Sequence, residues 1–120
     1  MTGLPLGIPF SSERRLLSGD AGLIVLGGEV DISTAPRFKE DLLALIDDGA
    51  RRIVVDLTEV TFIDSTALGV LIGGVRRLHE REGRLVLVAV TRPVLRALTL
   101  TGLDSVFTIC PTREQALAAL

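Results

Sequence analysis

Hydrophobic residues along the chain fall into short apolar runs and longer stretches with helical spacing. The runs at residues 23–26, 53–57 and 85–90 are rich in valine, isoleucine and leucine, which is typical of buried strands. The run 53–57 is apolar on both faces, so we expect it to be central in a sheet. A shorter candidate strand at 13–17 is joined to 23–26 by the turn Ser18-Gly19-Asp20, which predicts a hairpin.

Two stretches between these runs have the spacing of amphipathic helices. The first has apolar residues recurring from Phe38 to Ile46, with Gly49 at its end and Ser33 or Thr34 available as N-cap. After a connection over 58–63, the second runs from Ser65 to about Arg81 and is capped by Asp64 or Ser65.

The last third of the chain continues the alternation of strands and helices. A helix is predicted from Pro93 through Leu100, a strand over 106–109 and a final helix from Thr112 through Leu120. Residues 1–10 contain two prolines and two glycines and are expected to form an extended leader. Residues 11–120 then form one α/β domain, in which about four helices pack against a mixed sheet of four to five strands.

Composition narrows the classes of function. The chain has 13 Lys and Arg against 15 Asp and Glu, so it lacks the basic character of nucleic-acid-binding proteins and we expect no direct nucleic-acid partner. Cys110 is the only cysteine, which excludes an intrachain disulfide and a cysteine-based zinc site. The apolar runs fall short of the ~20 residues of a membrane-spanning helix, and the first residues lack the basic segment of a signal peptide. We therefore expect a cytoplasmic protein without membrane association.

Catalytic motifs are absent from the sequence. His79, the only histidine, follows Ser65 by fourteen residues on the same predicted helix, roughly 21 Å away at 1.5 Å per residue, so it cannot act as its base. We expect no enzymatic activity, no cofactor and no metal. His79 is interpreted as a surface residue, Cys110 as a small apolar filler, and the pair Gly73-Gly74 as a point of close helix-to-sheet packing.

The arginines leave two interpretations open. They either form a solvated helix face or include some that dock a partner, and their spacing does not decide between the two: Arg76, Arg77, Arg81, Arg84, Arg92 and Arg96.

Asp64, Ser65 and Thr66 place an acid and two hydroxyls at a strand-to-helix junction. Such oxygens can cap the free N–H groups of the helix, and capping alone would explain them. A helix N-terminus also stabilises added negative charge, so a hydroxyl there can be phosphorylated without unfolding the domain.

Three separated segments resemble the anti-sigma factor antagonists, also called anti-anti-sigma factors, whose single domain is known as STAS. The segments are GGEVDISTAPRFKEDL, IVVDLTEVTFIDSTALG and LTLTGLDSVFTI. The resemblance implies that Ser65 is the phosphoacceptor and that Asp31 lies beside it. The partner-binding residues that it indicates are Asp31, Ser33, Thr34, Asp64, Ser65, Thr66, Leu68 and Gly69.

The resemblance also implies a mechanism of partner switching. The unphosphorylated protein would bind an anti-sigma factor that is also a serine kinase, freeing a sigma factor; phosphorylation of Ser65 would reverse this and a serine phosphatase would reset it. The protein is expected to be a monomer or weak dimer. Ala67 stands where many members have glycine, which is expected to alter how closely a partner's backbone approaches.

Other classes of function stay open. The domain would then be a non-phosphorylated module that binds a small ligand, or an interaction subunit of a larger regulatory or transport assembly. A small hydrolase built on Ser65 is the third alternative.

Overall fold

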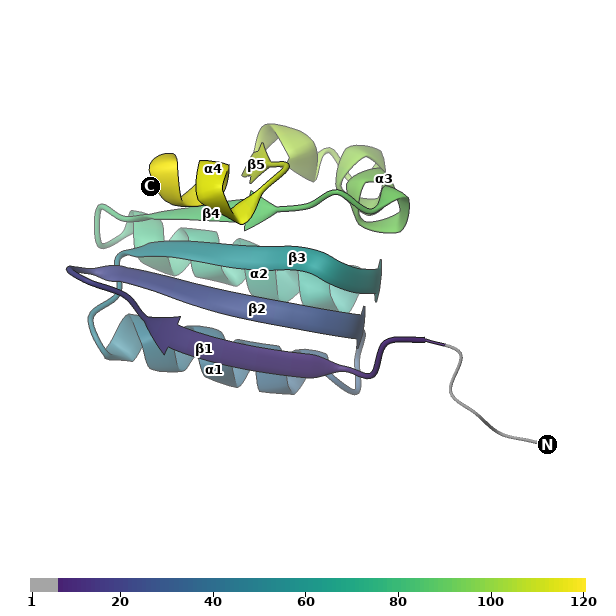
Figure 1. The fold of residues 1–120 in the computed structure, drawn as a ribbon, viewed down its shortest axis with the longest axis horizontal. Coiled ribbons are helices and arrows are strands. Elements are labelled where there is room, and N and C mark those ends of the chain that lie inside the picture. The colour runs from purple at the N-terminus through teal and green to yellow at the C-terminus, as the bar shows by residue number, and fades with distance from the viewer. Residues whose placement is uncertain (1–6) are drawn as a thin grey trace.

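A computed structural model describes residues 7–120, and its centre is a five-stranded sheet (Figure 1). Along the sheet the strands lie in chain order: β1 (Ser11–Leu16), β2 (Ala21–Val30), β3 (Arg52–Ile63), β4 (Arg84–Val88) and β5 (Thr108–Cys110). The first two form an antiparallel hairpin and the other neighbours pair in parallel. This confirms the predicted hairpin, the mixed sheet and the central place of the strand that contains residues 53–57.

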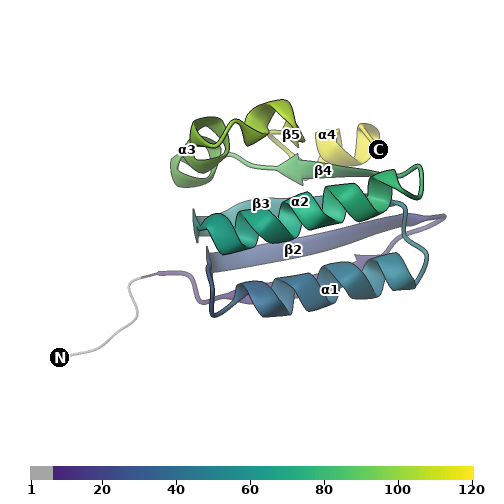
Figure 2. The ribbon, with the colours of Figure 1, turned by 180° about the vertical axis from the view of Figure 1, so that it is seen from behind.

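Helices cover both faces of the sheet, but unequally. Figure 2 shows α1 (Ala35–Asp47) and α2 (Ser65–His79) side by side on one face. Between them and the sheet lies the main core, which also takes in residues of α3 (Arg92–Leu100). A 3₁₀ turn at Leu103–Ser105 follows α3, and the short α4 (Arg113–Ala118) packs on the opposite face over a smaller apolar cluster.

All five strands differ from their predicted bounds, most of all β2 and β3, which extend well beyond the predicted 23–26 and 53–57. Residues 58–63 were predicted as a connection, but they continue the strand, and Val60 and Ile63 are buried while Glu59 and Phe62 are exposed. The extension is possible because β2 is also long, running over Ala21–Val30, and pairs with β3 up to Val30 and Ile63. On the other side of β3, strand β4 ends at Val88, two residues before the end of the predicted range 85–90. Strand β5 starts at Thr108, two residues after the start of the predicted range 106–109. The last helix is also shorter than predicted, ending at Ala118.

Residues 7–10 lead into β1 and have no regular secondary structure, whereas residues 1–6 of the predicted leader lie outside the described residues. The backbone of this segment crosses β2 at Gly28. A Cβ atom at Gly28 would lie 2.7 Å from the carbonyl oxygen of Ile8 and from the backbone nitrogen of Phe10. Gly28 also has a φ of 78°, which L-residues rarely adopt. Both constraints require glycine at this position.

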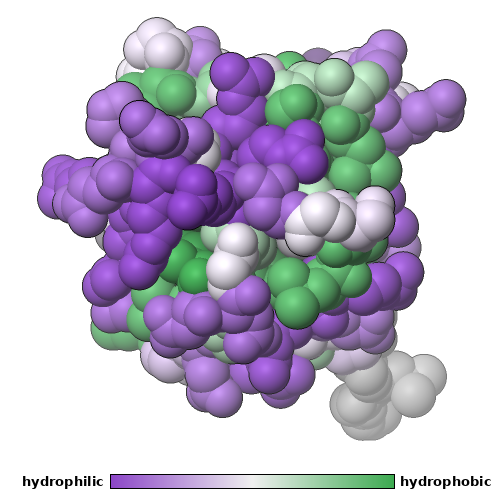
Figure 3. All heavy atoms as spheres, turned by 90° about the vertical axis from the view of Figure 1, so that its left-hand side faces the viewer, coloured by the Kyte–Doolittle hydropathy of each residue, from purple (hydrophilic) through white to green (hydrophobic). Residues whose placement is uncertain are grey.

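The amino ends of the parallel strands carry a dense mixture of charges. Figure 3 faces this end and shows a broad band of hydrophilic side chains with apolar patches beside it. Arg52 and Asp20 form an ion pair there, 2.7 Å apart, and Arg51, Glu80, Arg81 and Glu82 line a shallow polar depression. His79 is exposed, as predicted, at the end of α2 opposite to Ser65, and the six arginines singled out above are also exposed.

The lone cysteine and the glycine pair have different environments. Cys110 is partly buried against the smaller apolar cluster, which confirms its interpretation as a filler. A Cβ at Gly74 would lie 2.7 Å from Leu42 Cδ2 and 3.3 Å from Leu85 Cδ1, so this glycine allows close packing as expected. Gly73 has no such role, since a Cβ there would meet nothing within 4 Å.

Candidate functional site

The predicted site lies at the carboxyl ends of β2 and β3, where each strand passes into a helix. Both strands extend beyond β4, whose last paired residue, Val88, lies opposite Asp56. The connections from β2 to α1 and from β3 to α2 are therefore neighbours at the carboxyl-terminal edge of the sheet, the side on which the parallel strands end. This edge is open to a partner. Ligands and partners of open α/β sheets bind at this end of the strands.

Asp64 joins the two connections. It is the N-cap of α2, and its Oδ1 accepts a hydrogen bond from the backbone N–H of Ala67 at 3.0 Å. Its Oδ2 accepts from the N–H of Ile32 in the other connection at 3.1 Å, while its own N–H donates to the carbonyl of Val30 at 3.2 Å. One carboxylate thus caps the helix and fixes the neighbouring loop beside it, which brings Asp31 and Ser65 to the same edge.

The connection between β2 and α1 is held by its own polar groups. Asp31 Oδ1 accepts hydrogen bonds from the hydroxyl of Ser33 at 2.7 Å and from its N–H at 2.9 Å, and a longer one from the N–H of Thr34. The Thr34 hydroxyl accepts from the N–H of Asp31 and donates to the carbonyl of Glu29, both at 2.9 Å. Thr34, one of the two predicted candidates, occupies the N-cap position of α1, and its side chain makes no capping hydrogen bond to the helix. These groups instead close the loop on itself.

The same bonds affect the charge of Asp31. Hydrogen bonds from the Ser33 hydroxyl and from the Ser33 backbone stabilise the carboxylate and lower the pKa of Asp31 below its ordinary value. Asp31 therefore carries a full negative charge at neutral pH. Together with Asp64 it makes this edge of the sheet acidic.

Ser65 and Thr66 open α2 and are both exposed. Among residues 7–120 neither hydroxyl takes part in a hydrogen bond, because Asp64 already provides the cap. The two hydroxyls project from a helix N-terminus, whose partial positive charge favours an added anion. Ser65 is accessible to a modifying enzyme.

Leu68 and Gly69 complete the predicted partner-binding set, and the structure separates them. Gly69 is exposed on α2, whereas the side chain of Leu68 is buried in the main core and only 6% exposed. Ala67 is fully buried as well. The methyl group that distinguishes it from glycine therefore lies in the core, and the expected effect on a partner's approach is not supported.

Two exposed apolar residues at this edge were not predicted. Ile32 is 75% exposed in the loop held by Asp64, and Phe62, which precedes the junction on β3, is 45% exposed. These two side chains give this end of the sheet apolar area beside its polar groups, the mixture from which protein interfaces are built. A lone isoleucine within the polar stretch Asp31-Ile32-Ser33-Thr34 was the available signal for the first; the second was hidden because residues 58–63 were interpreted as a connection.

The structure also bears on metal binding and membrane insertion. Within residues 7–120 no three His, Cys, Asp or Glu side chains gather as the ligands of a metal ion would. In the same part of the chain, no helix combines the length and apolar character needed to cross a membrane.

Comparisons of the chain with known proteins identify similar sequences and structures. A model of the STAS domain family matches residues 17–116. The anti-sigma-B factor antagonist of Listeria monocytogenes is 37% identical over 86 residues, which cover 72% of this chain and 75% of that protein. The crystal structure of an anti-sigma factor antagonist from Mycobacterium paratuberculosis is similar with a TM-score of 0.80 at 30% identity, covering 98% of this chain and 97% of that one. The Bacillus cell fate determinant SpoIIAA in the phosphorylated form shares the fold, with a TM-score of 0.72 at 22% identity over 91% of this chain and 98% of that chain.

Proposed function

Because the chain belongs to the STAS domain family, we propose that it is an anti-sigma factor antagonist that is switched off by phosphorylation of Ser65. The family and the fold class agree with the resemblance and the architecture expected from the sequence. The observation that carries the proposal is the exposed hydroxyl of Ser65 at the start of α2, which makes no hydrogen bond within residues 7–120 and lies beside the loop that contains Asp31.

In the unphosphorylated state the edge formed by the two connections is the docking surface for an anti-sigma factor. Ile32 and Phe62 supply apolar contact area, and Ser33 and Thr66 supply polar groups around it. Binding of the anti-sigma factor to this edge frees a sigma factor. The protein acts by binding and is not itself an enzyme.

A phosphate on Ser65 opposes docking by electrostatics. It adds about −1.5 to −2 charge to an edge that already carries Asp31 and Asp64. Covering an unpaired charge in an interface costs about 2 to 5 kcal/mol, which corresponds to a loss of affinity of roughly thirty-fold to several thousand-fold. The modified protein therefore releases the anti-sigma factor.

The fold tolerates the phosphate. Ser65 makes no hydrogen bond that phosphorylation would break among the described residues, and the helix N-terminus stabilises the added anion by about 0.3 to 1 kcal/mol. The shared fold of SpoIIAA in its phosphorylated form supports this view. The switch then acts on the interface, and the anti-sigma factor serves as the serine kinase while a serine phosphatase restores the binding state.

The proposal is tested by incubating the protein with ATP, magnesium and candidate anti-sigma kinases and locating the phosphate by mass spectrometry. We expect one phosphate on Ser65, none on Ser65→Ala, and normal modification of Thr66→Ala, which is the matched control because Thr66 is equally exposed. Phosphate on Thr66 alone would contradict the assignment. Tight binding of the anti-sigma factor without phosphorylation by any kinase would instead support a non-phosphorylated interaction module.

A further inference from the structure

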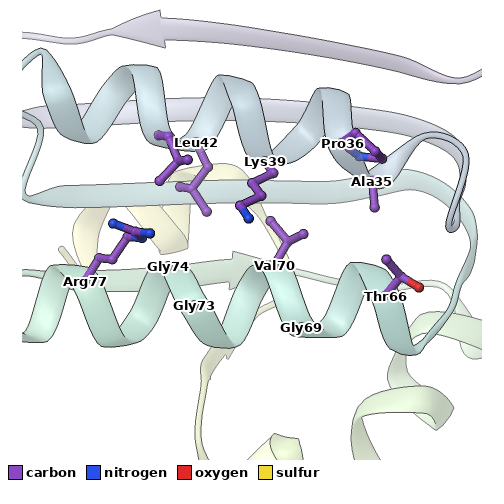
Figure 4. Close-up of a pocket in the computed structure, with 11 residues that line it drawn as sticks. Ala35, Pro36, Lys39, Leu42, Thr66, Gly69, Val70, Gly73, Gly74 and Arg77 are labelled. Carbon is purple, nitrogen blue, oxygen red and sulfur yellow. The ribbon is translucent and has the colours of Figure 1, made fainter.

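A second surface lies between the two helices that cover the main face of the sheet. Figure 4 shows a groove of about 490 Å³ between α1 and α2, with Ala35, Pro36 and Leu42 on one side and Val70 on the other. Gly69 and Gly73 of α2 face this groove, and a Cβ at either position would meet nothing within 4 Å. The groove is therefore open space bordered by apolar side chains.

The residues that line this groove include two cations and no acidic side chain. Lys39 of α1 and Arg77 of α2 both project into it (Figure 4). Neither cation forms an ion pair within the described part of the chain, so the charge of both is available to an occupant of the groove. The unpaired cations predict an occupant that carries carboxylates.

The shape of the groove favours a helix over a small ligand. It extends along α2 from Thr66 to Arg77, about 16 Å at 1.5 Å per residue, and is open along this length. A small ligand is usually enclosed over most of its surface, whereas an amphipathic helix lies in an open hydrophobic groove with its polar flanks in solvent. About three helical turns would fill the length of the groove.

We propose that the groove between α1 and α2 binds an acidic amphipathic helix of a partner protein. Apolar residues at i, i+3 or i+4 and i+7 of that helix pack against Leu43 and Val70, which line the groove and are partly exposed, and its carboxylates face Lys39 and Arg77. The inference goes beyond the switch at Ser65, since it uses no contact of that residue. In this proposal Arg77 is one of the surface arginines that dock a partner.

The test uses two synthetic amphipathic peptides of about 15 residues with identical leucine positions, one with glutamates on its flanks and the other with lysines. Each is titrated into the isotope-labelled full chain and followed by amide chemical shifts. We expect the glutamate peptide to shift amides of α1 and α2 along the groove and to bind about tenfold more tightly than the lysine peptide at low salt. Equal affinity of the two peptides, shifts confined to other surfaces, or no binding at millimolar concentration would overturn the proposal.

Two variants locate the binding. Lys39→Glu/Arg77→Glu is expected to prefer the lysine peptide, whereas Arg92→Glu/Arg96→Glu, with the same change of charge on the exposed face of α3, retains the original preference. Gly73→Leu adds a side chain to the groove at a position where a Cβ meets nothing within 4 Å, and it is expected to abolish binding while its melting temperature is not lowered. Thr99→Leu on the exposed face of α3 is its control. Reversal of the preference by the α3 variant or retained binding in Gly73→Leu would each contradict helix binding at this site.

Discussion

At the junction between β2 and α1 both hydroxyls are hydrogen-bonded within the loop, whereas at the junction between β3 and α2 neither hydroxyl is hydrogen-bonded to any residue that the structure describes. Asp31, Ser33 and Thr34 form a closed set of hydrogen bonds in the first connection. In the second, Asp64 makes the bonds and leaves Ser65 and Thr66 exposed. The residue types are the same, but the first junction uses them to maintain its shape and the second presents them to solvent.

The difference shows how a modification site is kept separate from stability. A hydroxyl that holds a loop together cannot be phosphorylated without loss of structure, since its proton and lone pairs are already engaged. A hydroxyl next to a capping aspartate is released from that task. We therefore expect substitutions at the first junction and at Asp64 to affect folding, and substitutions of Ser65 to affect binding alone.

The largest effect is expected for Ser65→Glu. Its negative charge on the acidic edge should weaken binding of the anti-sigma factor more than tenfold, because charge without a partner is costly in an interface. Titration calorimetry measures this affinity. Ser18→Glu, which adds the same charge to an exposed turn at the other end of the molecule, should leave it unchanged. Equal weakening by both variants would mean that net charge, not position, governs binding.

Asp64→Ala should reduce the free energy of unfolding by about 2 kcal/mol. It removes the cap of α2 and also the acceptor for the N–H of Ile32. Urea denaturation followed by circular dichroism gives this value. The neighbouring change Ser65→Ala should stay within about 0.5 kcal/mol of the unmodified protein, and a larger loss there would show that the hydroxyl supports the fold.

Thr34→Val should be destabilising by about 1 kcal/mol, since it leaves the N–H of Asp31 and the carbonyl of Glu29 without their partner. The same substitution at Thr66 removes a hydroxyl of the same kind from the second junction and should change stability by less than about 0.5 kcal/mol. Denaturant midpoints of the two variants provide the comparison. The proposed difference between the two junctions is contradicted if the Thr66 variant is the less stable of the two.

The smallest effect concerns pH. The pKa of Asp31 is lower in the folded state than in the unfolded chain, so its contribution to stability is complete above the unfolded pKa and is lost as pH falls through the folded pKa. Carbon-detected NMR titration of the Asp31 carboxyl should give a midpoint below that of an aspartate in an unstructured peptide. Ser33→Ala should raise that midpoint, because it removes the hydroxyl bond that contributes most to the shift; an unchanged midpoint would disprove the role of Ser33.

Local patterns in the sequence were sufficient for the order and type of the elements. The apolar runs identified β2, β3 and β4, and the helical spacing identified α1 and α2, because burial imposes these periods directly. The end of β3 was missed because its pairing depends on β2, a partner distant in sequence, and Thr58 and Glu59 are exposed on the extended strand. The proximity of the two connections likewise depends on the parallel pairing of β2 with β3.

Side-chain roles within the site were less accessible to sequence reasoning. The segment Asp64-Ser65-Thr66 identified the place, but either Asp64 or Ser65 could have been the cap, and only the geometry assigns that role to Asp64. Leu68 was included in the binding surface because of its position in the motif, although the turn of α2 points it into the core. Gly73 and Gly74 are adjacent glycines on the same helix, yet only Gly74 lies against the neighbouring helix α1. The sequence of one chain does not show which of the two makes this contact.

The two oxygens of Asp64 accept N–H groups from segments that are more than thirty residues apart in the chain. In an amide side chain one of these two oxygens is replaced by an NH2 group, which is a donor and would face one of the two N–H groups. In a library in which codons 64 and 65 are fully randomised and variants are selected for expression, we therefore expect almost only aspartate at position 64. At position 65 we expect several small amino acids. Serine would be enriched at position 65 only by a second selection, for signalling. Two adjacent positions are thus selected for different properties, one for folding and the other for regulation.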